Sequence, residues 1–180
     1  RTNMFAKRTS GEYASKAHSN TALKIAEEAI VLLKNESKIL PLAKNKIKTI
    51  AVIGANADRK NGYGGGSSQV KALYEVTPLA GIKNIIANSN INVLYAPGYT
   101  IERNATANNT LIAEAVAAAA KADVVIVVGG WTHGYDYNVW NDNAYDAEGV
   151  DKPNMDMPFG QNELIDAVTK ANPNTIVVLM

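Results

Sequence analysis

Apolar residues near the start of the chain recur with the spacing of an α-helix. In the segment that begins at Ser19, the residues at three- and four-residue intervals are Leu23, Ala26, Ile30 and Leu33. This spacing predicts an amphipathic helix of about four turns, with Ser19 or Asn20 as its N-cap and Pro41 beyond its end. Residues 1–18 lack such a period, and we expect them to form a linker or lead-in segment.

Short apolar runs and helical segments alternate through the rest of the chain. The runs lie at 47–54, 91–95 and 123–128 and from Thr175 onward, and the helical segments begin at Thr77, at about Thr110 and at Pro158. This alternation predicts an α/β layered sandwich with a mostly parallel β-sheet flanked by helices. We expect residues 19–180 to form this single domain. The last run reaches Met180, so we expect the sheet to be incomplete in this chain.

Charge and cysteine content exclude several classes of function. The 180 residues include 18 Lys and Arg against 17 Asp and Glu, and the net charge of +1 provides no field that would recruit nucleic acid or an anionic membrane. No apolar stretch is long enough to span a bilayer. Without cysteine there is no disulfide, thiolate zinc site or cysteine nucleophile. We expect no metal and no cofactor, and a homo-oligomer stays an open alternative.

The two longest loops, 55–76 and 129–157, both follow predicted strands. In a parallel sheet the carboxyl ends of the strands share one edge, so we expect both loops at the same edge. The first loop contains a glycine cluster that lacks dinucleotide spacing, because Ser67 stands where a third glycine is needed. A flexible turn is the plain alternative. Gly65, Ser67 and Ser68 instead suit close approach to a neutral polar ligand such as a sugar.

The second loop combines aromatic rings with carboxylates. Its rings and acids include Trp131, Tyr135, Tyr137, Trp140, Tyr145, Asp136, Asp142, Asp146, Glu148 and Asp151. Exposed rings in a loop indicate binding, whereas rings packed within the loop or on a partner domain would be structural. Desolvation of one carboxyl group, for instance Glu148, would raise its pKa and suit it to general acid catalysis. His133 by itself is more often a structural hydrogen-bonding residue.

Several stretches occur in the same order as in family 3 glycoside hydrolases, the β-glucosidase and β-xylosidase group. They are AEEAIVLLKN at 26–35, LPL at 40–42, IAVIGANA at 50–57, GGGSS at 64–68, TPLAGI at 77–82, ADVVIVVG at 122–129 and MPFGQ at 157–161. The chain therefore resembles the α/β sandwich domain that follows the catalytic barrel of that family. The resemblance covers residues 19–180.

The resemblance implies how catalysis is divided between two domains. A β/α barrel, absent here, carries the aspartate nucleophile, and a loop of the sandwich supplies the general acid/base. The family pattern ExEGxDR matches the chain at Glu148, with Asp146 in place of a glutamate and Lys152 in place of an arginine. Glu148 is therefore the expected acid/base, and Asp146 and His133 are lesser candidates. By the same resemblance the glycine loop and Trp131 border the sugar pocket. Tyr135 is a further substrate-binding candidate.

These expectations describe a domain of an exo-acting, retaining β-glycosidase that best fits a β-glucosidase acting on oligosaccharides or β-glucosides. The chain by itself would be inactive without the barrel. A β-xylosidase, a non-catalytic carbohydrate-binding or structural domain and, more remotely, a nucleotide binder are the alternatives. Relatives that process plant oligosaccharides suggest a periplasmic or secreted location.

Overall fold

The computed structural model describes residues 10–62, 72–132, 152 and 154–180. The chain forms two compact units, residues 1–40 and residues 41–180, and each is described by itself. Within the described residues no helix combines the length and the apolar character needed to cross a membrane. The expected boundary between residues 18 and 19 lies within a helix of the first unit and stays a prediction.

The first unit contains helix α1, Lys16–Ala29. Its N-cap is Ser15, whose Oγ accepts a hydrogen bond from the His18 backbone N–H at 3.4 Å, so the expected cap at Ser19 or Asn20 is wrong. The predicted continuation to Leu33 is also wrong, because the backbone turns extended at Ile30. No residue of α1 is buried, and the β-branched pair Ile30 and Val31 that follows it is largely exposed and has a lower helix propensity.

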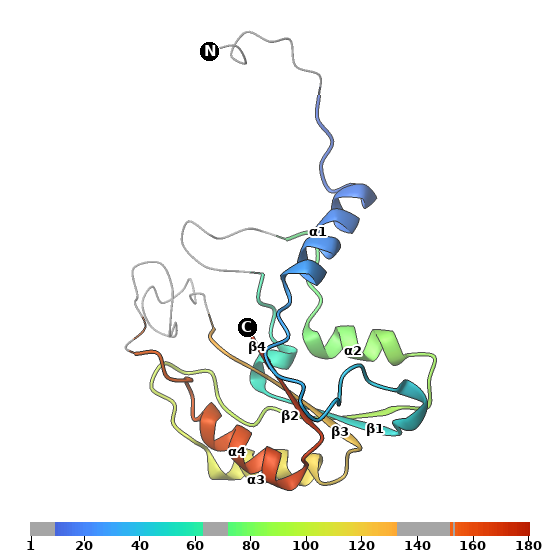
Figure 1. Ribbon diagram of the computed structural model, residues 1–180. Helices are drawn as coiled ribbons and strands as arrows, with labels where there is room; N and C mark the ends of the chain where they lie inside the picture. The colour runs from blue at the N-terminus through green and yellow to red at the C-terminus, as the bar shows by residue number, and fades with distance from the viewer. Residues whose placement is uncertain (1–9, 63–71, 133–151, 153) are drawn as a thin grey trace. The chain divides into compact units, whose positions relative to one another are not determined.

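The second unit is an α/β sandwich built on a four-stranded sheet in its described part (Figure 1). The strands are β1 Thr49–Ile53, β2 Asn92–Ala96, β3 Val124–Gly129 and β4 Thr175–Leu179. They lie in the order β2-β1-β3-β4, and all three pairs are parallel. This confirms the predicted fold class and its parallel sheet.

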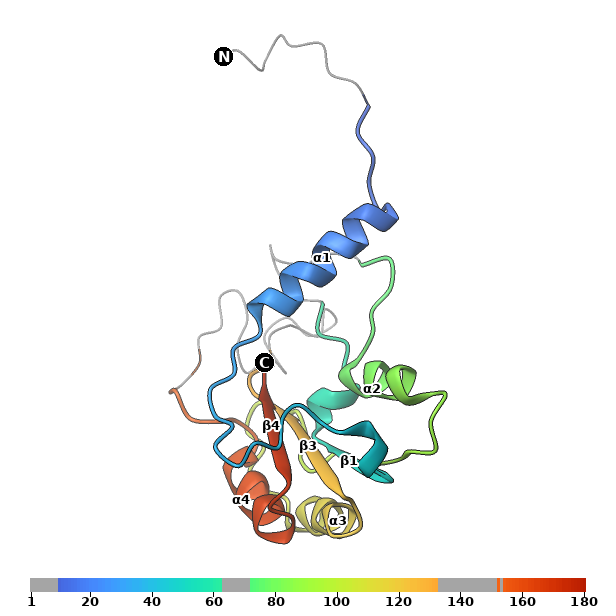
Figure 2. The same ribbon diagram turned by 45° about the vertical axis from the view of Figure 1, so that its right-hand side comes forward.

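Helices cover both faces of this sheet (Figure 2). Helix α2, Pro78–Ile86, packs on one face, and α3, Asn109–Ala119, and α4, Gln161–Ala171, pack side by side on the other. The short 3-10 helices η1, Lys44–Lys46, and η2, Ala55–Asp58, flank β1. Alternate residues of the central strands enter the two cores, as in a sheet buried on both sides: Ala51 and Ile53 face α3 and α4, whereas Ile50 and Val52 face α2.

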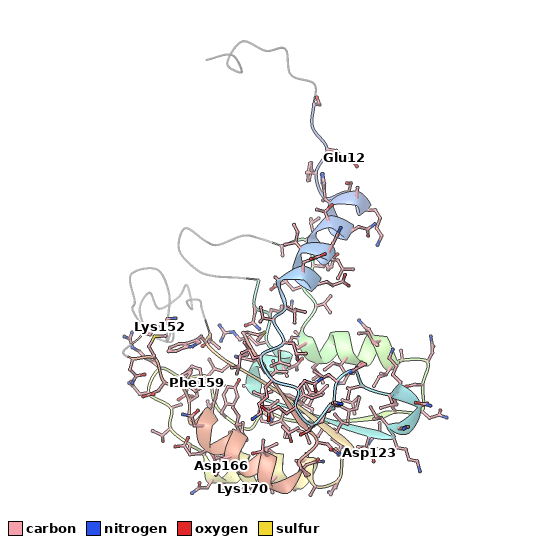
Figure 3. The ribbon with its side chains drawn as sticks, viewed as in Figure 1. Glu12, Asp123, Lys152, Phe159, Asp166 and Lys170 are labelled. Carbon is pink, nitrogen blue, oxygen red and sulfur yellow. The ribbon has the colours of Figure 1, made fainter. Side chains whose placement is uncertain are left out.

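Asp123 joins the amino ends of the two central strands. Its Oδ2 accepts hydrogen bonds from the backbone N–H groups of Lys48 at 2.7 Å and Thr49 at 2.9 Å. These two backbone donors are the main reason that the pKa of the Asp123 carboxyl lies below its ordinary value of 3.8. Figure 3 shows Asp123 at the end of the sheet opposite Lys152 and Phe159.

This pairing predicts an acid-dependent stability. A carboxyl group whose pKa is lower in the folded chain stabilises the fold above the unfolded pKa and loses that contribution as the pH falls through the folded one. We expect Asp123→Asn to lower the urea midpoint of the chain at pH 7 and to flatten the decline of that midpoint below about pH 4. Asp166→Asn, which changes an exposed helical ion pair, is the control and should leave the neutral-pH midpoint nearly unchanged. If the urea midpoint fell equally below about pH 4 in the wild type and in Asp123→Asn, the assignment would be contradicted.

Candidate active site

The crossover of the chain marks one edge of the sheet as the candidate site. From β1 the chain passes to β2 on one side and then to β3 on the other, so the strand order reverses between β1 and β3. In open parallel sheets ligands bind at the carboxyl ends of the strands at such a switch point. Both loops singled out in the sequence leave the sheet at this edge, one after β1 and one after β3.

The backbone at the end of β1 lies against the neighbouring strand. Gly54 has φ of +120°, and a Cβ atom there would collide with the carbonyl oxygen of Val128. Only glycine fits this combination of conformation and close approach. The turn brings η2 next to β3 and leaves the side chain of Asn56 fully buried.

Tyr99 connects η2 to β3 across this edge. Its ring is 2% exposed, and its hydroxyl accepts the Asn56 backbone N–H and donates to the Val128 carbonyl, both at 3.2 Å. The ring also stacks on Phe159, with centroids 6.0 Å apart. Burial is the main cause that raises the pKa of Tyr99 to about 12, so the phenol stays neutral and able to donate.

The end of β3 is held by an amide from α4. Gln161 is 1% exposed; its Nε2 donates to the Gly130 carbonyl at 2.9 Å, and its Oε1 accepts the Gly130 N–H at 2.8 Å. Gly130 has φ of +106°, and a Cβ atom there would collide with the backbone of Met180. The Trp131 N–H then donates to the Met180 carbonyl at 3.0 Å. The chain therefore leaves β3 along a fixed path.

Trp131 and Lys152 flank the second loop and meet in space. The Lys152 ammonium lies 4.3 Å from the centroid of the Trp131 ring, within the range of a cation–π interaction. Trp131 also packs against the core cluster on the α3 and α4 face. The described residues on either side of 133–151 are thus joined to each other.

Of the site residues predicted from sequence, the structure describes Trp131. The others lie outside the described residues: the catalytic candidates Glu148, Asp146 and His133, and the substrate-binding candidates Gly65, Ser67, Ser68 and Tyr135. Their roles, and a contact between Trp131 and substrate, stay predictions. The described ends of both loops nevertheless lie at the one edge that the strand pattern predicts.

Sequence reasoning missed the buried polar side chains that build this edge. Asn56, Tyr99 and Gln161 sit in segments that resemble ordinary turns and helix starts, and their partners lie far along the chain. Both polar atoms of the Asn56 side chain and the hydroxyl of Thr132 are buried and have no hydrogen-bond partner among the described residues. Such groups are rare in folded proteins.

Removing the Tyr99 hydroxyl tests this network. Tyr99→Phe keeps the ring and its stacking on Phe159 but deletes an acceptor and a donor in a buried place. We expect the free energy of unfolding to fall by about 1–3 kcal/mol, measured by urea denaturation at pH 7. Tyr95→Phe is the matched control, because Tyr95 is 39% exposed and its side chain makes no hydrogen bond among the described residues; it should stay within about 0.5 kcal/mol. Equal effects of the two changes would contradict the bridging role.

The chain matches the glycosyl hydrolase family 3 C-terminal domain over residues 30–180. It is 37% identical to beta-glucosidase BoGH3A of Bacteroides ovatus over 195 aligned positions, covering 100% of this chain and 24% of that protein. It is 33% identical to a beta-xylosidase of Formosa agariphila, covering 94% of this chain and 22% of that protein. The crystal structure of a Bifidobacterium adolescentis GH3 beta-glucosidase superposes with a TM-score of 0.71 at 36% identity, over 93% of this chain and 22% of that one.

The chain thus spans about a quarter of the length of the relatives that it matches. The match includes every strand of the described sheet and both loops at its carboxyl edge. The fold expected from the resemblance is the fold observed. The chain belongs to glycosyl hydrolase family 3, as a C-terminal domain of that family.

Proposed function

We propose that this domain supplies the general acid/base of an exo-acting, retaining β-glycosidase, and that Glu148 is the residue that does so. The observation that supports the proposal is the place of the described residues that flank the Glu148 segment, at the end of β3 and at Lys152. The chain leads into this segment from the carboxyl end of β3, at the switch point where ligands bind in open parallel sheets. The motif Glu148-Gly149 with Asp151 supports the choice of carboxylate.

In the proposed mechanism Glu148 acts twice. An aspartate of a separate β/α barrel attacks the anomeric carbon, the bond from that carbon to the glycosidic oxygen breaks, and the Glu148 carboxyl gives its proton to the departing oxygen. The Glu148 carboxylate then takes a proton from water as the water oxygen displaces the aspartate and releases the sugar. Because the nucleophile belongs to the barrel, the chain by itself should be inactive.

The first loop and the aromatic residues would shape the pocket around the leaving group. We assign Gly65, Ser67, Ser68, Trp131 and Tyr135 to its border. Backbone groups next to glycine and serine hydroxyls suit the hydroxyls of a sugar, and an aromatic ring suits its C–H face. Asp146 and His133 remain the lesser candidates for the proton-transfer role.

We propose that the enzyme releases a terminal β-D-glucosyl residue, and a terminal β-xylosyl residue is the second candidate. Two of the three relatives compared are named as β-glucosidases and one as a β-xylosidase. The ratio of kcat/KM for an aryl β-glucoside to that for the matching β-xyloside, measured on the full-length enzyme, decides between them. The proposal includes a periplasmic or secreted location.

The acid/base assignment is tested by Glu148→Gln in the full-length enzyme. For a substrate with a poor leaving group, such as an alkyl β-glucoside, we expect kcat/KM to fall by about 10²–10⁴-fold, because general acid catalysis contributes that much. An aryl β-glucoside with an activated leaving group needs no protonation, so its kcat/KM should change little. Azide should restore turnover of the activated substrate by replacing water and should yield the β-glycosyl azide.

The matched controls are Asp146→Asn and His133→Gln in the same loop. Each should leave the ratio of kcat/KM for the activated aryl β-glucoside to that for the alkyl β-glucoside close to the wild-type ratio. A wild-type kcat/KM of Glu148→Gln on the alkyl β-glucoside would refute the assignment. If the selective loss on that substrate appeared in Asp146→Asn instead, the role would pass to Asp146.

A further inference from the structure

The loop that follows β1 contains an asparagine that is followed by a glycine, Asn61-Gly62. No other asparagine among the 180 residues precedes a glycine. In such a pair the backbone nitrogen of the second residue can attack the side-chain amide carbon of the first. Glycine hinders this attack least, because it has no Cβ atom. The pair is therefore a candidate site of covalent self-modification.

The structure leaves the side-chain amide of Asn61 accessible. Asn61 and Gly62 are both exposed and belong to no helix or strand, and they follow Arg59, the C-cap of η2. The Asn61 Nδ2 donates to the Arg59 carbonyl at 3.2 Å and to the Met180 Sδ at 3.9 Å. Water competes for the first contact at this exposed place, and sulfur is a weak acceptor in the second. The two contacts thus restrain the amide only weakly.

A carboxylate contacts the nitrogen that would attack. The Gly62 backbone N–H donates to Glu75 Oε1 at 2.9 Å. A Cβ atom at position 62 would lie 2.9 Å from the same oxygen, so glycine permits this close approach of the carboxylate to the backbone. The hydrogen bond joins residues that are 13 positions apart, so the fold creates it and the local sequence does not.

Thr77 accounts for the place of Glu75 beside the first part of the loop. The Thr77 Oγ1 accepts the Ala80 N–H at 3.2 Å as the N-cap of α2, and the same hydroxyl donates to Asp58 Oδ1 of η2 at 3.3 Å. The residues just before α2 are therefore joined to η2. Glu75 lies two positions before Thr77 and Gly62 lies four positions after Asp58, so this contact brings the two ends of the loop together.

The hydrogen bond to Glu75 has two possible effects of opposite sign. As a restraint it would hold the Gly62 nitrogen away from the amide carbon and slow the attack. As a general base the carboxylate would take the proton that the nitrogen must lose in order to attack. A base must lie within about 2.6–3.2 Å of the proton-bearing atom, and Glu75 does. One exposed hydrogen bond restrains the backbone little, so we expect proton removal to dominate.

We propose that Asn61 is a site of deamidation and that Glu75 is the general base that promotes it. The Gly62 nitrogen gives its proton to the Glu75 carboxylate and forms a bond to Asn61 Cγ. The bond from Cγ to Nδ2 breaks, and ammonia leaves with the proton that Glu75 held. Water then opens the succinimide ring at either carbonyl and leaves aspartate or isoaspartate at position 61. Water is the only other reactant.

Either product changes the loop near its start at the carboxyl edge of the sheet. The new carboxylate has no proton to donate to the Arg59 carbonyl, so that hydrogen bond is lost. It also places a second negative charge near the Gly62–Glu75 hydrogen bond, and like charges repel. Isoaspartate adds a carbon atom to the backbone between η2 and Gly62. The modification therefore alters both the charge and the path of the chain at the edge where the candidate site lies.

The test follows deamidation of the full-length enzyme during incubation at neutral pH. Peptide mass spectrometry of timed samples gives the deamidated fraction at each asparagine, and electron-transfer fragmentation distinguishes aspartate from isoaspartate. Asn88 is the internal reference, because it is exposed and the N–H of the next residue, Ser89, donates to the Ile86 carbonyl at 2.8 Å instead of to a carboxylate. We expect Asn61 to deamidate about tenfold faster than Asn88 or more.

Two changes at position 75 separate the base from the restraint. Glu75→Gln keeps an oxygen that can accept the Gly62 N–H but cannot take up its proton, and we expect it to slow deamidation of Asn61 by about tenfold or more. Glu75→Ala removes both the base and the restraint and should slow the reaction as well. Glu163→Gln, at an exposed glutamate of α4, is the control and should leave the rate at Asn61 unchanged.

The rate at Asn88 in the same samples reports whether a variant has kept its fold. Slower deamidation of Asn61 in both position-75 variants, with Asn88 unaffected, supports the proposal. Deamidation of Asn61 no faster than that of Asn88 in the wild type would overturn the site. An unchanged rate in Glu75→Gln, or a faster one in Glu75→Ala, would overturn the role of Glu75 as a base. None of these readouts requires glycosidase activity, so they stand or fall independently of the proposed function.

Discussion

The close approach of β1 and β3 at their carboxyl ends is the constraint on which the candidate site depends. Gly54 lies so near the Val128 carbonyl that a side chain there would collide with it, and the Tyr99 hydroxyl bonds to that same carbonyl and to the N–H of Asn56. The two contacts fix η2 against β3. Because the strand order reverses between these strands, the same contacts define the edge at which a ligand is expected.

From this edge the two loops depart with their starting points fixed by buried polar groups. Tyr99 acts on the exit from β1 and Gln161 on the exit from β3, and Phe159 links the two by stacking on Tyr99 two residues before Gln161. An apolar core would hold the layers together equally well. The hydrogen bonds also fix the direction in which the chain leaves each strand, which apolar packing alone does not. The family membership indicates the class of reaction in which such a domain takes part, since the relatives compared are named as glycosidases.

The periodic elements were accessible from the sequence, because strands buried on both faces are apolar runs and because Thr77 and Pro78 mark the start of α2. The N-terminal helix was misplaced, because its apolar spacing continues past Ala29 although Ile30 and Leu33 are exposed and the helix ends before them. The polar supports of the site could not be predicted, since Tyr99 and Asn56 lie 43 positions apart and Gln161 and Gly130 lie 31 apart. Such pairings depend on the folded topology. Glu148 came from motif resemblance, and that kind of signal names a residue without placing it.

The central claim is that this edge of the sheet presents Glu148 to the glycosidic oxygen. A crystal structure of the full-length enzyme, with the sugar trapped on the nucleophile by a slow fluorinated substrate, tests it most directly. The account predicts a Glu148 carboxylate oxygen at about 3 Å from the water that will attack the anomeric carbon, with Lys152 on Trp131 and Gln161 on Gly130 as in the free chain. A different carboxylate next to that water, with Glu148 turned away from the sugar, would contradict it.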